Sequence, residues 1–274
     1  MKKGELFNLK KGFYIVTGGM GLMGQMHCEV IAEYGGTPVI FDINSNGFES
    51  FKKKFKKYTL NEPIFIKTDI TDESSIQNSL DLLRKKDKKV YGLINNAARN
   101  PKVSSEGLEE SYRLENFDIK EWEKDLKVGL TGAFICTKII GTYMNNNDGG
   151  SIINISSDLG IIAPNQNIYK KDNLENDQQF VKPVSYSVIK SGMVGLTKYT
   201  STYWPLKVRC NCLCPGGIYT DQTGEFLNKI KELIPMQRMA NKNEYKGSII
   251  FLLSNASSYM NGSIISIDGG RTAW

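Results

Sequence analysis

Short apolar runs alternate with segments of helical periodicity along the whole chain. The runs are rich in β-branched residues and mostly apolar on both faces, as the central strands of a parallel sheet are. They span Phe13–Thr17, Pro38–Phe41, Ile64–Ile66, Val90–Asn95, Ser151–Ile155, Lys207–Cys214 and Ile264–Ile267. Helices are predicted between them at 22–35, 46–58, 73–86, 118–146, 184–203, 224–233 and 242–253. Strict alternation implies right-handed crossovers. The sequence therefore predicts an α/β fold with one doubly wound, mainly parallel seven-stranded sheet and helices on both faces.

Local signals and chain length favour a single domain. Asp118 followed by Glu121 is typical of a helix N-cap with a capping box, and Pro205 is placed to end the helix before it. No internal repeat or low-complexity linker interrupts the pattern. Since 274 residues suffice to bury a core without disulfide or metal support, we expect one domain over residues 1–274.

The charge balance gives no sign of a nucleic-acid or membrane partner. The chain has 35 Lys+Arg and 29 Asp+Glu, a formal net charge of +6. In one lysine-rich run Phe48, Phe51 and Phe55 recur at helical spacing, so its lysines form the solvated side of an amphipathic helix. No apolar stretch approaches the roughly 20 residues of a membrane span, and Met1–Lys11 lacks the apolar segment of a signal peptide. A cytoplasmic protein is expected.

Cysteine and histidine usage does not indicate a metal site. Cys210, Cys212 and Cys214 alternate along one predicted strand and lack the paired spacing of zinc or redox sites. His27 is the single histidine and lies at helical spacing just after a glycine-rich loop. We therefore expect neither an imidazole-based metal site nor a Ser-His-Asp triad.

A glycine-rich loop joins the first predicted strand to the first predicted helix. In Thr17–Gly24 the glycines allow a tight turn and a close approach of the backbone to a pyrophosphate, which the helix N-terminus then binds. Asp42 ends the second strand 18 residues after Gly24, where a carboxylate can accept hydrogen bonds from an adenosine ribose. Asp42 would repel a 2′-phosphate and is followed by Ile43, not arginine. The pattern indicates a Rossmann dinucleotide site that prefers NAD.

Tyr186 and Lys190 form a YxxxK motif on a predicted helix. Residues i and i+4 share a helix face, so the ammonium can lie close to the phenol. A free phenol has a pKa near ~10. A neighbouring cation and an oxidised nicotinamide would favour the phenolate, which makes tyrosine usable as a general base.

Together, these segments make the chain resemble the short-chain dehydrogenase/reductase family from about residue 12 to the C-terminus. Further matching stretches are Thr68-Asp69-Ile70, Asn95-Asn96-Ala97-Ala98, Ile155-Ser156-Ser157, Pro215-Gly216-Gly217 and Asp268-Gly269-Gly270. The resemblance implies that Tyr186 is the catalytic acid/base, that Ser157 hydrogen-bonds the reacting oxygen, and that Lys190 holds the nicotinamide ribose. It also implies cofactor-binding roles for Gly18, Gly21, Met23, Gly24, Asp42, Asp69, Ile70, Asn96, Ala97, Tyr186, Lys190, Gly216, Ile218 and Thr220.

Three features depart from the family pattern. Leu22 replaces a loop glycine, and the spacing of Gly18, Gly21 and Gly24 is that of the extended, sugar-nucleotide-modifying branch. Gly129 replaces an asparagine that helps to hold a proton-relay water, so that relay must be rebuilt or weakened. Ser157 and Tyr186 are 29 positions apart, which indicates an insertion after the serine.

Three polar excursions, near 99–116, 158–182 and 219–240, are expected at the carboxyl edge of the sheet, where they would shape a substrate pocket. Arg99, Lys102 and Lys182 are candidates to pair with a phosphate or carboxylate. The run 180–190, Tyr203-Trp204 and the ending 269–274 also resemble bacterial oxidoreductases of surface-sugar and flagellin-modification gene clusters.

The leading interpretation is an NAD-dependent oxidoreductase that acts on a secondary alcohol or ketone of a polar, sugar-like small molecule. One alternative is a redox-neutral epimerase or dehydratase with bound NAD, which rests on the glycine spacing. The other is a catalytically weak NAD-sensing protein, which rests on Gly129. The resemblance also implies a homodimer or homotetramer.

Overall fold

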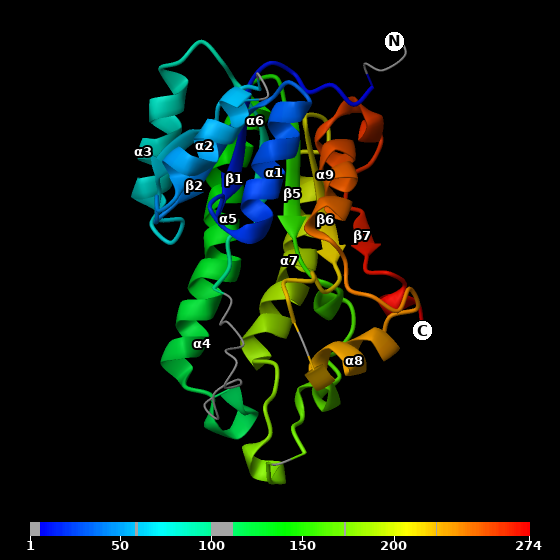
Figure 1. Cartoon of the computed structure of the whole chain (residues 1–274). Coiled ribbons are helices and arrows are strands. Elements are labelled where there is room, and N and C mark those ends of the chain that lie inside the picture. Colours follow the sequence, from blue (N-terminus) through cyan, green and yellow to red (C-terminus); the bar gives the residue numbers. More distant parts are fainter. Residues whose placement is uncertain (1–5, 58–59, 100–111, 173, 223) are drawn as a thin grey trace.

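Seven parallel strands form the central sheet in the order β3-β2-β1-β4-β5-β6-β7. The computed structural model describes residues 6–57, 60–99, 112–172, 174–222 and 224–274 (Figure 1). The strands are β1 (Phe13–Thr17), β2 (Thr37–Asp42), β3 (Ile64–Lys67), β4 (Val90–Asn95), β5 (Gly150–Ile155), β6 (Val208–Pro215) and β7 (Ile264–Ile267). Because the chain crosses from β3 to the other side of β1, the strand order reverses between β1 and β4. Ligands of such sheets bind at this point, beyond the carboxyl ends of the strands.

Helices cover both faces of the sheet, as the sequence predicts. The first face carries α1 (Leu22–Glu33), α2 (Phe48–Lys57) and α9 (Lys246–Leu253), whose apolar residues join one core cluster with β1, β2 and β4 to β6. The second face carries α3 (Glu73–Arg84), the helical segment 119–146 and α7 (Val184–Tyr203), next to a second core cluster. The predicted single-domain Rossmann-type fold is therefore confirmed.

The predicted helix over 118–146 is one helical segment with two wider turns. Its α-helical parts are α4 (Ile119–Leu126), α5 (Gly132–Cys136) and α6 (Thr142–Asn146), and π-helical turns at Lys127–Thr131 and Thr137–Gly141 join them. Asp118 caps the segment by accepting a hydrogen bond from the backbone N–H of Lys120.

The predicted capping box at this helix is wrong. Glu121 does not reach back to the N-cap backbone, because its carboxylate forms ion pairs with Arg99 at 2.9 Å and with Lys124 at 2.6 Å. The competing cation Arg99 follows β4, far from the helix in sequence, so the local spacing gave no sign of it.

Two of the three predicted excursions pack against each other below the sheet. In Figure 1 the arrowheads of β5, β6 and β7 point toward the bottom, where α8 (Gly224–Glu232, orange) and the lime-green segment before α7 lie. Ile168 of the 158–182 excursion packs with Ile230, Ile234 and Met239 of the 219–240 excursion. Residues 100–111 of the remaining excursion lie outside the described part of the chain.

The amphipathic helix predicted from the lysine-rich run is present as α2, where Phe51 and Phe55 are buried. The five cysteines are buried and form no disulfide. Within the described ranges, no helix combines the length and apolar character that crossing a membrane requires.

Candidate active site

A cavity of about 790 Å³ lies at the carboxyl edge of the sheet, where the segments that follow β1 to β6 meet. Such a volume is typical of small-molecule and cofactor sites. Of the residues predicted for the site, the cavity is lined by Gly18, Gly21, Met23, Asp42, Asp69, Ile70, Asn96, Ala97, Ser157, Tyr186, Lys190, Gly216, Ile218 and Thr220. Among the predicted catalytic and cofactor-binding residues, Gly24 is the one that does not line the cavity. The fold thus brings together motifs that are dispersed over most of the sequence.

The glycine-rich loop forms one end of this cavity. Gly18 has a φ of +61°, and a Cβ there would lie 2.9 Å from the Cα of Ala97. A Cβ on Gly24 would overlap the carbonyl oxygen of Gly18, so Gly24 allows α1 to pack closely on the loop. Gly21 is the N-cap of α1 and supplies no side-chain cap. The N–H groups of the first turn therefore remain available for an anion such as a pyrophosphate.

Asn96 and Thr17 fasten the loop to β4. The Asn96 side-chain amide donates to the carbonyl oxygens of Thr17 at 2.9 Å and Gly18 at 3.2 Å. The backbone N–H groups of Asn96 and Ala97 both donate to the Thr17 hydroxyl at 3.0 Å. Sequence reasoning did not predict that the Thr17 hydroxyl joins the loop to β4, although a hydroxyl at the end of β1 lies beside the end of a neighbouring strand.

Two aspartates stand at the side of the cavity formed by β2 and β3. The Asp42 carboxylate accepts hydrogen bonds from the backbone N–H groups of Met20 at 3.0 Å and Asn44 at 3.1 Å. Asp69 accepts both the N–H and the hydroxyl of Thr71 at 2.8 Å. These bonds orient both carboxylates at the end of the cavity next to the glycine-rich loop.

Ser157, Tyr186 and Lys190 lie together at the opposite end. The Ser157 hydroxyl donates to Asp158 at 2.6 Å, and Ser157 and Tyr186 line the same end of the cavity. The Lys190 ammonium donates to the carbonyl oxygen of Ile155 at 2.9 Å and lies 5.7 Å from the centre of the Tyr186 ring. A phenol beside a hydroxyl and an ammonium has the groups needed to take up and release a proton.

A second lysine lies closer to the tyrosine than the predicted one. The Lys182 ammonium is 3.9 Å from the centre of the Tyr186 ring. Lys182 directly precedes Pro183, the N-cap of α7, and its backbone N–H donates to the Gln166 side chain at 2.9 Å. The inserted segment thus contributes a cation to the end of the cavity that holds Tyr186.

Burial dominates the ionisation of these groups. It raises the pKa of the Tyr186 phenol, and the Ser157 hydroxyl opposes that rise. Burial lowers the pKa of Lys190 to about 8, and it lowers that of Lys182 to about 8 while Asp158 opposes that change. The protein groups alone therefore do not produce the lowered tyrosine pKa that we expect of a general base.

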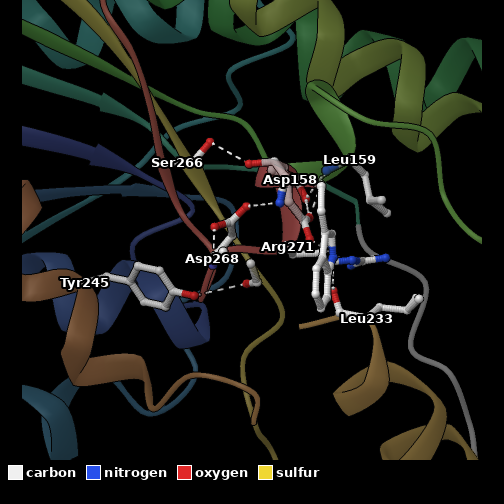
Figure 2. A network of polar contacts seen from close by, with 12 residues as sticks. Asp158, Leu159, Leu233, Tyr245, Ser266, Asp268 and Arg271 are labelled. Carbon is white, nitrogen blue, oxygen red and sulfur yellow. Dashed lines mark hydrogen bonds and ion pairs between the residues drawn. The ribbon is translucent and has the colours of Figure 1, made fainter. Parts of the chain in front are cut away.

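A buried ion pair supports the serine. Arg271 and Asp158 are joined at 2.7 Å, and their side chains are only 6% and 4% exposed (Figure 2). Asp268 accepts the backbone N–H groups of Gly270 and Thr272, which shapes the last turn and directs Arg271 inward. Sequence reasoning missed this pair because no local spacing relates residues so distant in the chain.

The structure shows what occupies the space beside Gly129. A Cβ on Gly129 would lie 2.8 Å from the Ile189 side chain, so isoleucine occupies the space beside this glycine.

Of the candidate anion-binding cations, Arg99 is paired with Glu121 and Asp125. Lys102 lies outside the described residues, and Lys182 lines the cavity.

Comparisons with known proteins show what the chain is similar to. The profile described as "short chain dehydrogenase" matches residues 13–170, and the profile described as "Enoyl-(Acyl carrier protein) reductase" matches residues 174–272. Post-translational flagellin modification protein A of Campylobacter coli is 26% identical over 263 residues, covering 96% of this chain and 98% of that protein. A flagellin modification protein is thus among the relatives, as the sequence led us to expect.

Proteins named as alcohol or sugar-acid dehydrogenases are also similar. The NAD-dependent glycerol dehydrogenase of Listeria innocua is 27% identical over 272 residues, covering 97% of this chain and 96% of that protein. A gluconate 5-dehydrogenase from Burkholderia cenocepacia, solved in complex with NADP and tartrate, has a TM-score of 0.83 at 22% identity, with 98% of each chain covered. The latter similarity concerns the fold.

Proposed function

Because the chain belongs to the short-chain dehydrogenase family, we propose that it is an NAD-dependent oxidoreductase acting on a secondary alcohol or ketone of a polar, sugar-like substrate. The observation that carries this proposal is the cavity that joins the glycine-rich loop at one end to Ser157, Tyr186 and Lys190 at the other. A dinucleotide bound along such a cavity would have its phosphates at the loop and its reactive ring beside the tyrosine.

The cavity fits a dinucleotide along its length. Gly18, Gly21 and Met23 would hold the pyrophosphate at the uncapped N-terminus of α1. Asp42 would bind the adenosine ribose, and Asp69 and Ile70 would contact adenine. Asn96 and Ala97 would contact ribose. The nicotinamide end would be contacted by Gly216, Ile218 and Thr220. Because the Asn96 amide already binds the loop, its expected contribution is to hold the loop as well as to line the cavity.

The bound nicotinamide supplies the hydride acceptor or donor. In the direction of alcohol oxidation Tyr186 takes the hydroxyl proton, and in the reverse direction it returns that proton to the carbonyl oxygen. Lys182 and Lys190 favour the phenolate because both ammonium groups lie near the Tyr186 ring. Ser157 lines the same end of the cavity as the phenol and would position the reacting oxygen.

The preference for NAD rests on Asp42. Its carboxylate is held at the cavity edge by two backbone N–H groups and is followed by Ile43. The cationic residues of the lining are Arg99, Lys182, Lys190 and Arg271, and none of them belongs to the segments that follow β2 and β3. A 2′-phosphate at this position would meet a negative charge, whereas a ribose hydroxyl can donate to it.

The experiment that tests the proposal is the change in nicotinamide absorbance with NAD and a panel of free, phosphorylated and nucleotide-linked sugars and polyols. We expect Tyr186→Phe to lose about 10²- to 10⁴-fold in kcat while it still binds NADH. Tyr199→Phe is the matched control, because Tyr199 lies on the same helix and is exposed. Equal turnover by Tyr186→Phe and Tyr199→Phe would refute the assignment. Tightly retained NAD without net NADH formation would favour a redox-neutral reaction instead.

A further inference from the structure

The cations that line the cavity differ in what they already bind. Arg271 is paired with Asp158 at 2.7 Å, and Arg99 with Asp125 at 3.1 Å. Lys190 donates to the carbonyl oxygen of Ile155. Within the described ranges, no carboxylate forms an ion pair with Lys182. Neither lysine has a carboxylate partner in the described part of the chain, but the Lys190 ammonium is directed at the Ile155 carbonyl oxygen, so Lys182 is the lining cation more open to a ligand.

Lys182 lies where a ligand group would be close to the reacting carbon. Its ammonium is 3.9 Å from the centre of the Tyr186 ring, and its backbone is fixed by the hydrogen bond to Gln166. A substrate whose hydroxyl reaches the Tyr186 phenol would bring neighbouring atoms within reach of this ammonium. A group bound to Lys182 thus lies only a few bonds away from the carbon that exchanges hydride.

The charges around this position favour an anion. The negative charge of Asp158 is balanced by Arg271 and hydrogen-bonded by Ser157 and the Leu159 N–H. Lys182 and Lys190 then leave an excess of positive charge, although burial lowers the pKa of both. Charged groups withdrawn from water require a partner, and an anionic substituent on the substrate would supply one.

We propose that Lys182 binds a carboxylate of the substrate, so that the substrate is a hydroxy acid or its keto acid, with the carboxylate near the reacting carbon. This inference rests on the proposed function, since it takes Tyr186 to mark the reacting carbon. A carboxylate matches the single charge of Lys182. A phosphate monoester carries about −1.5 to −2 at neutral pH and would need a second cation, but Arg271 and Arg99 are already paired, and Lys190 donates to Ile155 and is expected to hold the nicotinamide ribose.

The test compares hydroxy acids with neutral compounds of the same carbon skeleton. The pairs are gluconate with glucitol, galacturonate with galactose, and 3-hydroxybutyrate with 1,3-butanediol, titrated calorimetrically into the NADH complex of the full chain. A charge-assisted hydrogen bond changes affinity by about 10- to 100-fold. We expect at least one acid to bind the unmodified protein more tightly than its neutral partner by such a factor.

Variants identify the residue responsible. Lys182→Gln should bring the acid-to-neutral affinity ratio close to one, and Lys182→Arg should restore most of it. Lys171→Gln is the matched control, because Lys171 also lies over an aromatic ring in the inserted segment but does not line the cavity. Its ratio should match that of the unmodified protein.

Two results would overturn the inference: equal affinities within every pair for the unmodified protein, or an unchanged ratio in Lys182→Gln. The readout is binding and not turnover. Carboxylate selectivity without hydride transfer would therefore refute the proposed function and leave only a carboxylate-binding site at Lys182. Hydride transfer to NAD without carboxylate selectivity would support the proposed function and refute this inference.

Discussion

Removing Arg271 should destabilise the fold, because it leaves the buried Asp158 carboxylate without its counter-charge. In Arg271→Met a side chain of moderate length remains, while the Asp158 carboxylate loses the guanidinium at 2.7 Å. Both side chains are at most 6% exposed, so water does not replace the lost partner. Loss of one member of a buried pair typically costs about 3–5 kcal/mol. Asp158 keeps its hydrogen bonds to Ser157 and Leu159, so we expect the lower end, about 3 kcal/mol.

An exposed pair of equal length provides the control. Arg238 and Glu244 also approach to 2.7 Å, but their side chains are 47% and 41% exposed. Solvent-exposed pairs contribute about 0–1 kcal/mol, so Arg238→Met should change stability by no more than this. The contrast between the two variants isolates burial, since the residue replaced and the ion-pair distance are the same.

Urea denaturation at a fixed protein concentration gives the free energies of unfolding. The double variant Arg271→Met/Asp158→Asn removes both charges. Its loss in free energy of unfolding should be smaller than the sum of the losses in the two single variants, by about 2 kcal/mol. If Arg271→Met loses no more than Arg238→Met, the pair is screened by solvent. The argument from burial would then be refuted, together with the view that Arg271 neutralises Asp158 in the cavity.

Three further predictions concern the cofactor end and the buried lysine. Asp42→Asn should raise the NADP-to-NAD ratio of kcat/KM by about ten-fold or more, because it removes a charge that repels a 2′-phosphate; an unchanged ratio would contradict the assigned role. Gly24→Ala places a Cβ against the Gly18 carbonyl oxygen and should cost about 1–3 kcal/mol in denaturation. In contrast, Gly195→Ala on α7 meets open space and should be neutral or stabilising. Burial lowers the pKa of Lys190 to about 8, so the unfolded chain binds more protons between pH 8 and the ordinary lysine pKa near ~10.4. Stability relative to Lys190→Met should therefore rise between pH 8 and 10, and parallel pH curves for the two proteins would contradict this.

The sheet and most of the site follow from local patterns. Seven apolar runs between helical segments become seven parallel strands, because strands buried on both faces must be apolar throughout. The dispersed motifs then converge, since the carboxyl ends of parallel strands meet at one edge. Asp42 and Tyr186 lie in one cavity for this reason.

The contacts missed by sequence reasoning are those set by distant side chains. Arg271 binds Asp158, 113 positions away in the chain, and Arg99 binds the Glu121 carboxylate that a capping box would use. Neither pairing has a characteristic spacing. Helical periodicity predicted that Lys190 lies near Tyr186, but it gave no sign that Lys182, which precedes the helix, lies closer to the ring.

The two ends of the cavity depend on different parts of the chain. At the cofactor end, the loop and the aspartates are held by backbone hydrogen bonds beside the strand ends. At the other end, Asp158, Tyr169 and Lys182 all belong to the segment between β5 and α7. Tyr169 stacks on Phe226 of α8, with ring centres 5.7 Å apart, which fixes this segment against the rest of the cavity. If a dinucleotide binds as we propose, changes within 158–182 alter the end of the cavity beside Tyr186 and leave the glycine-rich loop and Asp42 in place, so we expect them to change substrate preference more than dinucleotide binding.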